Sequence, residues 1–191
     1  MSAPVPPSEP QPDPAGGAPR RSLWWLAAAV ATAGYAADQT TKALAVANLV
    51  PGQVRPLLGE VLQLHLIRNS GAAFGLGEGS TWVFTIVSAA VSVAVAVLLR
   101  RVRSRGWALA LGLLLAGAVG NLTDRLVRAP GVGRGHVVDF LQLPSWPIFN
   151  VADSCVVCAA VLIAVLGLRG VRLDGTRERA VTTGPQEAPG A

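Results

Sequence analysis

Two carboxylic acids stand out as residues that could do chemistry together. Asp139 lies in the apolar run VVDF, and Asp153 lies in FNVADS, with thirteen residues between the two. An apolar setting raises the pKa of a carboxyl group, and two carboxyls that meet can share one proton. One member of such a pair activates a water molecule while the other protonates a leaving amine. From the spacing alone, both peptide hydrolysis and a proton relay stay open.

Other polar residues accompany these two aspartates near the ends of apolar segments. They are Asp38, Thr41 and Lys42 in DQTTK, Asn69, then Asn121, Asp124 and Arg125 in GNLTDR, and Asn150 in FNVADS. Offsets of three or four residues place the members of each motif on one helical stripe. A structural alternative is that they only form pairs, such as Asp38 with Lys42 or Asp124 with Arg125. A charged side chain buried at the depth of the lipid tails costs several kcal/mol. So many charged and polar residues at one end of the helices therefore favour a functional role over a purely structural one.

The elements that must position these residues are four apolar segments. Of the 191 residues, 51% are hydrophobic and 14% are charged, against about 25% charged in a soluble domain. Four segments approach the roughly 20 residues that cross a bilayer: Leu23–Val50, Gly79–Leu99, Gly106–Thr123 and Ile148–Leu168. The sequence therefore predicts an all-α integral membrane protein with four transmembrane helices, whose polar residues collect on one side.

The distribution of basic residues predicts the orientation in the membrane. With a cytoplasmic N-terminus, ten arginines fall on the inner side, and six Lys and Arg residues fall on the outer side. We expect residues 1–20 to be a disordered, Pro-rich cytoplasmic tail, 21–170 to be the membrane domain, and 171–191 to be a second disordered cytoplasmic tail. Both termini are thus expected inside the cell.

The segment between the first two helices has a different pattern. VLQLHLI alternates apolar and polar residues after a turn at Pro51 and Gly52, which predicts a small extracytoplasmic β-element. The Gly-rich GAAFG that follows, beginning at Gly71, adds little bulk and lets backbone approach a substrate closely.

Five motifs in this order resemble one known family. DQTTK, RNSGAAFG, GNLTDR, VVDF and FNVADS together are similar to the lipoprotein signal peptidase family, signal peptidase II, over roughly residues 22 to 170. The resemblance implies a four-helix aspartic endopeptidase of the bacterial plasma membrane. Such an enzyme removes the signal peptide of prolipoproteins, cutting before a cysteine that carries a diacylglyceryl group.

The resemblance also assigns roles to residues of this chain. The catalytic pair falls on Asp139 and Asp153. Residues that bind or orient the substrate and the pair fall on Asp38, Lys42, Asn69, Gly71, Asn121, Asp124, Arg125 and Asn150. The expected partners are prolipoproteins and membrane lipids, with no cofactor, and the expected state is a monomer.

Several other functions are disfavoured. Cys155 and Cys158 spell CxxC within an apolar helix and are expected to pack, and His65 and His136 lack ligand spacing, so no metal site is predicted. The basic residues form no stripe for nucleic acid. A transporter would place its charges near the bilayer midplane, at a repeat interface that this chain lacks. A non-catalytic scaffold remains the other alternative, and loss of turnover on replacing the aspartates would exclude it.

Overall fold

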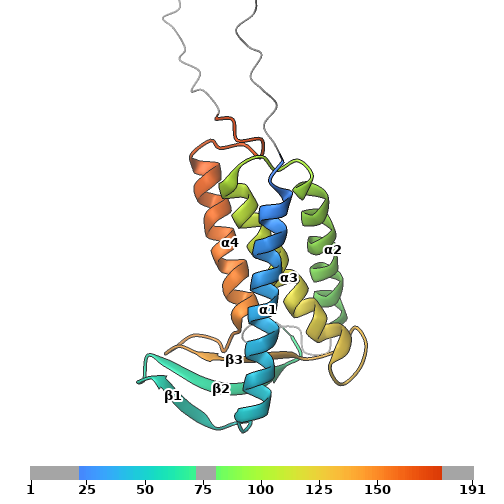
Figure 1. Cartoon of the computed structure of the whole chain (residues 1–191). Coiled ribbons are helices and arrows are strands. Elements are labelled where there is room, and N and C mark those ends of the chain that lie inside the picture. The colour runs from blue at the N-terminus through green and yellow to red at the C-terminus, as the bar shows by residue number, and fades with distance from the viewer. Residues whose placement is uncertain (1–21, 72–80, 178–191) are drawn as a thin grey trace, which may run out of the picture.

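The computed structural model describes residues 22–71 and 81–177. Four helices, α1 (Trp24–Asn48), α2 (Thr81–Leu99), α3 (Arg105–Val127) and α4 (Val151–Leu168), accompany three strands, β1 (Val54–Leu58), β2 (Leu62–Asn69) and β3 (Val137–Gln142). The helices stand side by side in alternating directions, and the sheet lies across one end of the bundle (Figure 1). The predicted tail at 1–20 lies outside the described residues.

Three of the helices have the length and hydropathy needed to cross a membrane. These are α2, α3 and α4, with 19, 23 and 18 residues. Helix α1 has 25 residues, enough for about 37 Å of helix, but the polar run DQTTK in its second half lowers its hydropathy. Each helix coincides with one of the four segments predicted from the sequence, and no helix extends more than four residues beyond its segment.

Helix α3 is the central element, because it packs against each of the other three helices. Small residues allow this approach. A Cβ atom at Gly117 would overlap the carbonyl oxygen of Ala152 in α4, and one at Gly120 would lie 2.6 Å from the carboxylate of Asp38 in α1. Packing through small residues is typical of helices that meet inside a membrane, where close contact replaces hydrophobic association.

The predicted small β-element is part of a three-stranded sheet in the order β1-β2-β3. β2 covers most of the predicted VLQLHLI element and pairs antiparallel with β1, and β3, which we expected to be loop, pairs with β2 so that Ile67 lies opposite Asp139. In β3, the alternate residues Val138 and Phe140 are buried against Ala45 of α1. Because neighbouring residues of a strand point to opposite faces, Asp139 points away from this core.

The other end of the bundle is closed by backbone contacts. The N–H groups of Arg103 and Ser104 donate to the carbonyl of Leu173, and the indole of Trp107 donates to the carbonyl of Val171 at 2.8 Å. Residues 171–177, which we assigned to the C-terminal tail, thus pack on the loop between α2 and α3, and the rest of that tail lies outside the described residues.

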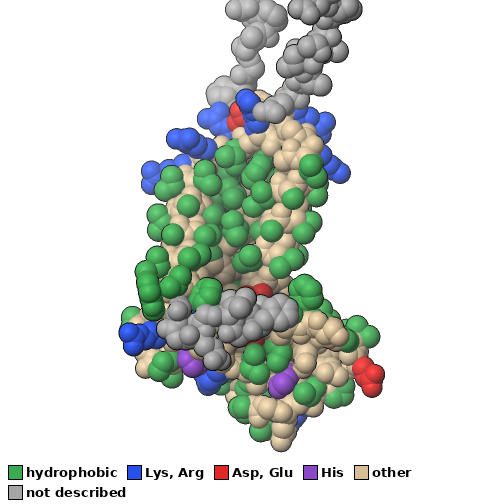
Figure 2. Space-filling view, turned by 180° about the vertical axis from the view of Figure 1, so that it is seen from behind, with side chains coloured by type: hydrophobic (Ala, Val, Ile, Leu, Met, Phe, Trp, Pro, Cys, Tyr) green, Lys and Arg blue, Asp and Glu red, His purple; other side chains and the backbone are tan. Residues whose placement is uncertain are grey.

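Arginines crowd this same end of the bundle, opposite the sheet. Figure 2 shows blue side chains gathered there, above helices covered with apolar side chains. The exposed ones are Arg100, Arg101, Arg103, Arg105, Arg169, Arg172 and Arg177. The two ends of the bundle therefore differ sharply in charge and in fold.

Candidate active site

Four charged side chains form an ion cluster where the bundle meets the sheet. The ammonium of Lys42 lies 2.9 Å from a carboxylate oxygen of Asp38 and 2.9 Å from one of Asp124. The second oxygen of Asp124 lies 2.6 Å from Nε of Arg128. Asp38, Lys42 and Asp124 are 0% exposed. Two carboxylates and two cations balance, so this ion cluster of Asp38, Lys42, Asp124 and Arg128 buries no net charge.

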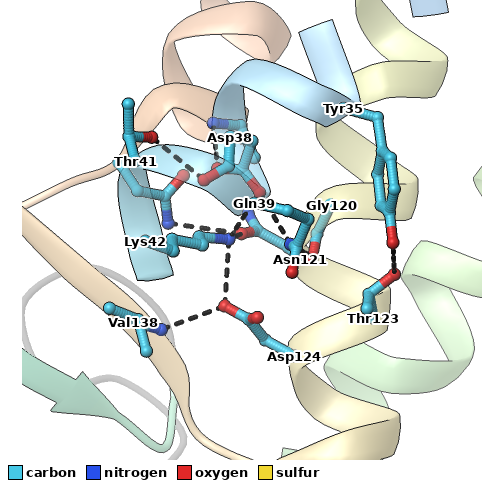
Figure 3. A network of polar contacts seen from close by, with 12 residues as sticks. Tyr35, Asp38, Gln39, Thr41, Lys42, Gly120, Asn121, Thr123, Asp124 and Val138 are labelled. Carbon is cyan, nitrogen blue, oxygen red and sulfur yellow. Dashed lines mark hydrogen bonds and ion pairs between the residues drawn. The ribbon is translucent and has the colours of Figure 1, made fainter. Parts of the chain in front are cut away.

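The ion cluster joins four elements of the fold (Figure 3). Asp38 of α1 accepts a hydrogen bond from the backbone N–H of Ala152 in α4, at 2.9 Å. Asp124 of α3 accepts one from the N–H of Val138 in β3, at 3.1 Å. Val138 precedes Asp139, so the cluster fixes the backbone beside that carboxyl. The alternative pair of Asp124 with Arg125 is wrong: Asp124 contacts Lys42 of α1 and Arg128, the residue that directly follows α3.

A cavity of about 430 Å³ opens beside the ion cluster. Asp139 and Asp153 line it, together with Asn69, Gly71, Phe84, Asn121 and Arg125. The loop between β3 and α4 supplies its apolar wall, from Trp146 to Phe149. The cavity therefore combines two carboxyls, several amides and a guanidinium with apolar surface.

Asp139 is held by amides and forms no ion pair with another described residue. Its oxygens accept hydrogen bonds from the side-chain amide of Asn150 at 2.6 Å and from that of Asn69 at 2.8 Å. The residue is 2% exposed. Burial, followed by the nearby carboxylate of Asp153, raises the pKa of Asp139 to about 7, although both amides lower it. This carboxyl therefore holds a proton more readily than an ordinary aspartate at neutral pH.

Asp153 is fixed by the first turn of α4. It forms a capping box with Asn150, in which each side chain accepts a hydrogen bond from the other residue's backbone N–H. Its other oxygen accepts from the side-chain amide of Asn121 at 2.8 Å. Asn121 in turn accepts from Lys42 at 3.0 Å, which orients the amide toward Asp153. Asn150 contacts both Asp139 and Asp153, so one residue sets the spacing of the two carboxyls.

Arg125 brings an incompletely paired cation to the cavity. The residue is only 7% exposed, and its Nη2 donates to the carbonyl of Gly71 at 3.3 Å. Its guanidinium lies 5.3 Å from the ring centroid of Phe84. Among the residues that the structure describes, Nε and Nη1 have no hydrogen-bond partner. A buried donor without a partner is costly, so a site beside the two carboxyls stands ready to accept an oxygen ligand.

The structure brings all ten predicted site residues to one end of the bundle. Sequence reasoning missed Arg128 and Phe84. Arg128 lies four residues after Asp124, a helical spacing that signals such a pair, whereas nothing in the sequence connects Phe84 to Arg125. Cys158 was expected to pack but is exposed, while Cys155 is buried. Residues 72–75 of GAAFG lie outside the described residues.

Within residues 22–71 and 81–177, no group of three or more His, Cys, Asp and Glu side chains is arranged to hold a metal ion. His65 contacts the side chain of Gln142 at 3.0 Å.

Comparison with known proteins identifies relatives of the whole membrane domain. Residues 30–169 match the family described as Signal peptidase (SPase) II. The chain is 50% identical over 173 residues to a lipoprotein signal peptidase of Rhodococcus jostii, covering 87% of this chain and 86% of the relative. It is 52% identical over 155 residues to one of Leifsonia xyli, covering 81% and 72%.

A solved structure shares the fold. A bacterial membrane enzyme determined at 2.3 Å resolution aligns with a TM-score of 0.72 and 24% identity, covering 89% of this chain and 98% of that one. The four-helix arrangement with a sheet at one end is therefore also the fold of a known membrane enzyme.

Proposed function

The chain belongs to the signal peptidase II family, whose members process lipoprotein precursors, and we propose that it hydrolyses its substrate with Asp139 and Asp153. The observation that carries this proposal is the contrast in partners at one site. These two carboxyls line a common cavity and share Asn150, whereas Asp38 and Asp124 of the ion cluster pair with Lys42 and Arg128.

In the proposed mechanism, the two carboxyls share one proton and exchange roles. Burial and the charge of Asp153 favour a protonated Asp139, which leaves Asp153 as the base. Asp153 removes a proton from a water molecule, whose oxygen attacks the scissile carbonyl carbon. Asp139 donates its proton toward the substrate, and the amine leaves after it has been protonated. The amides of Asn69, Asn121 and Asn150 hold both carboxyls in place throughout.

Arg125 is proposed to stabilise the tetrahedral intermediate. Hydrolysis puts negative charge on the former carbonyl oxygen, and donors fixed beforehand are the most effective stabilisers of such charge. The unpartnered Nε and Nη1 of Arg125 supply donors of this kind beside the carboxyls. Phe84 and the carbonyl of Gly71 hold the guanidinium in position.

We further propose that all four helices cross the plasma membrane, with both termini in the cytoplasm. Helix α1 has the length to span, and its polar DQTTK run faces α3 and α4 through Asp38 and Lys42 instead of facing lipid. The exposed arginines gather at the end opposite the sheet, as expected for a cytoplasmic surface. The carboxyls then lie at the outer ends of the helices, where an exported prolipoprotein presents its diacylglyceryl cysteine. The proposed unit is a monomer in contact with membrane lipids.

The function is tested with the purified enzyme and a synthetic prolipoprotein peptide that carries a diacylglyceryl cysteine. We expect cleavage of the bond that precedes this cysteine, identified by mass spectrometry, and no cleavage by Asp139→Asn. Cleavage at another bond, or none by the unaltered enzyme, would refute the assignment.

Topology is tested separately. Reporters fused after Arg101 and after Arg172 should report cytoplasm, and a reporter near Gly131 should report the outside. A cytoplasmic signal at Gly131 would put the carboxyls on the wrong side of the membrane for an exported substrate.

A further inference from the structure

The peptide group between Ser70 and Gly71 lies beside the catalytic cavity, directly after strand β2 ends at Asn69. Its N–H donates to the side-chain oxygen of Asn69 at 2.9 Å, and its carbonyl oxygen accepts a hydrogen bond from the hydroxyl of Thr81 at 2.5 Å. Thr81 begins α2 and is 6% exposed. We propose that Thr81 is a positioning residue that fixes this peptide and, through it, the amide of Asn69 that contacts Asp139. This inference rests on the proposed function.

The amide of Asn69 has one favourable orientation at the site. Its nitrogen donates to a carboxylate oxygen of Asp139 at 2.8 Å. Its oxygen faces the N–H of Gly71, which is a donor and pairs with that oxygen alone. An amide rotated by half a turn would bring its oxygen to the carboxylate and its NH₂ group to the N–H, and both contacts would be repulsive. The N–H of Gly71 therefore decides which atom of Asn69 meets Asp139.

The Ser70–Gly71 peptide lies beyond the strand pairing that would otherwise hold it. The ladder between β2 and β3 ends with Asn69 opposite Val137. Gly71 has no Cβ atom, so the peptide that precedes it rotates with little steric resistance. Because the C=O and N–H of a trans peptide point in opposite directions, a bond that fixes the carbonyl also fixes the N–H. The hydroxyl of Thr81 supplies that bond.

The hydroxyl of Thr81 is used differently from three other threonine hydroxyls in the helices. Those of Thr41, Thr85 and Thr123 each donate to the backbone carbonyl four residues earlier in the same helix. Such a bond is local and needs no partner from another element. Thr81 instead donates to Ser70, eleven residues earlier and beyond the end of β2. Its hydrogen bond is therefore a tertiary contact that joins the start of α2 to the edge of the site.

The other two amides at the carboxyls are anchored by groups of comparable kind. The oxygen of Asn121 accepts from the ammonium of the ion cluster, and that of Asn150 accepts from the N–H of Asp153 in the first turn of α4. Each amide nitrogen is then left to donate to a carboxyl. Asn69 has its donor outside the helices and strands, so the anchoring part falls to Thr81.

The proposal is tested with variants that keep or remove one hydroxyl. Thr81→Val removes it at nearly constant volume, and Thr81→Ser keeps it. Thr85→Val is the matched control, because its hydroxyl donates to the carbonyl of Gly133 in the loop between α3 and β3. In cleavage measured per membrane-inserted molecule, we expect kcat of Thr81→Val to fall about tenfold at unchanged KM. Thr81→Ser and Thr85→Val should keep a normal kcat.

The pH profile of kcat separates positioning from folding. The hydrogen bond from Asn69 lowers the pKa of Asp139. Three other charged groups act on this carboxyl, namely Asp153, Lys42 and Arg125. Loss of the hydrogen bond favours the protonated carboxyl, so the decline of kcat above about pH 7 should move to higher pH in Thr81→Val and return in Thr81→Ser. A change in the stability of α2 alone would reduce the amount of inserted protein and leave the profile in place.

A double-mutant cycle tests the route through Asn69. In Asn69→Ala the amide is absent, so the addition of Thr81→Val should lower kcat no further. Thr81→Ala removes the same hydroxyl and replaces Thr81→Val if that variant does not insert. A normal kcat and pH profile in the variant without the hydroxyl, or effects that multiply in the cycle, would overturn the role of Thr81. If the unaltered enzyme does not cleave the diacylglyceryl peptide, the proposed function fails instead.

Discussion

The ion cluster and the catalytic cavity lie side by side and contain two aspartates each, yet they treat their carboxyls in opposite ways. In the ion cluster, Lys42 contacts both Asp38 and Asp124, and Arg128 contacts Asp124 again. In the cavity, Asp139 and Asp153 accept hydrogen bonds from amides, and no ion pair with either is formed in the described part of the chain. The carboxylates of the ion cluster contact cations directly, whereas Asp139 accepts its hydrogen bonds from amides, and burial together with the nearby Asp153 raises its pKa.

This difference separates a structural role from a chemical one within a few residues. The ion cluster ties α1, α3, α4 and β3 together and is electrically balanced. The cavity places a carboxyl with a pKa of about 7 next to a second carboxyl and a partly unpartnered guanidinium. The stable cluster holds the backbone on both sides of the reactive pair, through Val138 beside Asp139 and Ala152 beside Asp153.

The largest effect outside the pair itself should come from Arg125. Arg125→Gln removes the charge that faces the developing oxyanion, and we expect kcat to fall by about 10² to 10³. The amount of folded, inserted protein should change much less, because among the described residues the guanidinium donates one hydrogen bond, to the carbonyl of Gly71, and lies over the ring of Phe84. Single-turnover cleavage measures this, with Arg68→Gln, an exposed residue of β2, as the control. A normal kcat in Arg125→Gln would remove the oxyanion role.

The ion cluster should respond in stability. Asp124→Asn leaves Lys42 and Arg128 without their shared partner, and breaking a buried pair in this way costs about 3–5 kcal/mol. We therefore expect less membrane-inserted protein and a lower melting temperature in detergent. Glu60→Gln, at an exposed position in the turn between β1 and β2, is the control. A stability equal to that of the control would mean that the cluster does not hold the fold.

For Asp139, unlike Asp124, we expect the charged form of the carboxyl to destabilise the folded protein. Its folded pKa of about 7 exceeds the unfolded value near 4, so the folded state binds more protons between these pH values. Stability therefore falls as the pH rises from 4 to 8, by up to about 4 kcal/mol. Asp139→Asn lacks this ionisation, so the unaltered protein should lose melting temperature relative to the variant over this range. A constant difference between the two proteins from pH 4 to pH 8 would contradict the shift.

The rate of cleavage should also depend on the protonation of Asp139. Loss of the proton from Asp139 leaves two ionised carboxyls and no acid, so kcat should decline as the pH rises above about 7. The pH profile of single-turnover cleavage records this decline, and a kcat that stays constant or rises above pH 7 would contradict the role of Asp139 as the acid.

The smallest expected effect is that of a chelator. The proposed reaction uses carboxyls alone, so EDTA should leave the rate of cleavage unchanged. Loss of cleavage that is restored by a divalent ion would require a metal that the proposed mechanism does not contain.

Much of this arrangement could be predicted from the sequence. The four helical segments follow from long apolar runs, and the site residues follow from five ordered motifs whose polar positions recur at helical spacing. Strand β3 could not be predicted, because VVDF is a short apolar run whose partner, β2, lies some seventy residues earlier. The partner of Asp124 was assigned to the wrong residue, since sequence proximity favours Arg125 while helix geometry brings Arg128 and Lys42 to it. The exposure of Cys158 depends on how α4 is rotated in the bundle, which an all-apolar helix does not reveal.

The comparison between the two regions is tested most directly by four matched variants. Asp38, Asp124, Asp139 and Asp153 are each replaced by Asn, and single-turnover cleavage is measured per membrane-inserted molecule. We predict that Asp139→Asn and Asp153→Asn insert normally and bind substrate but do not cleave it. Asp38→Asn and Asp124→Asn should accumulate poorly, with turnover retained in the molecules that fold. Substantial cleavage by Asp139→Asn or Asp153→Asn would contradict the account and transfer the catalytic role to Asp124.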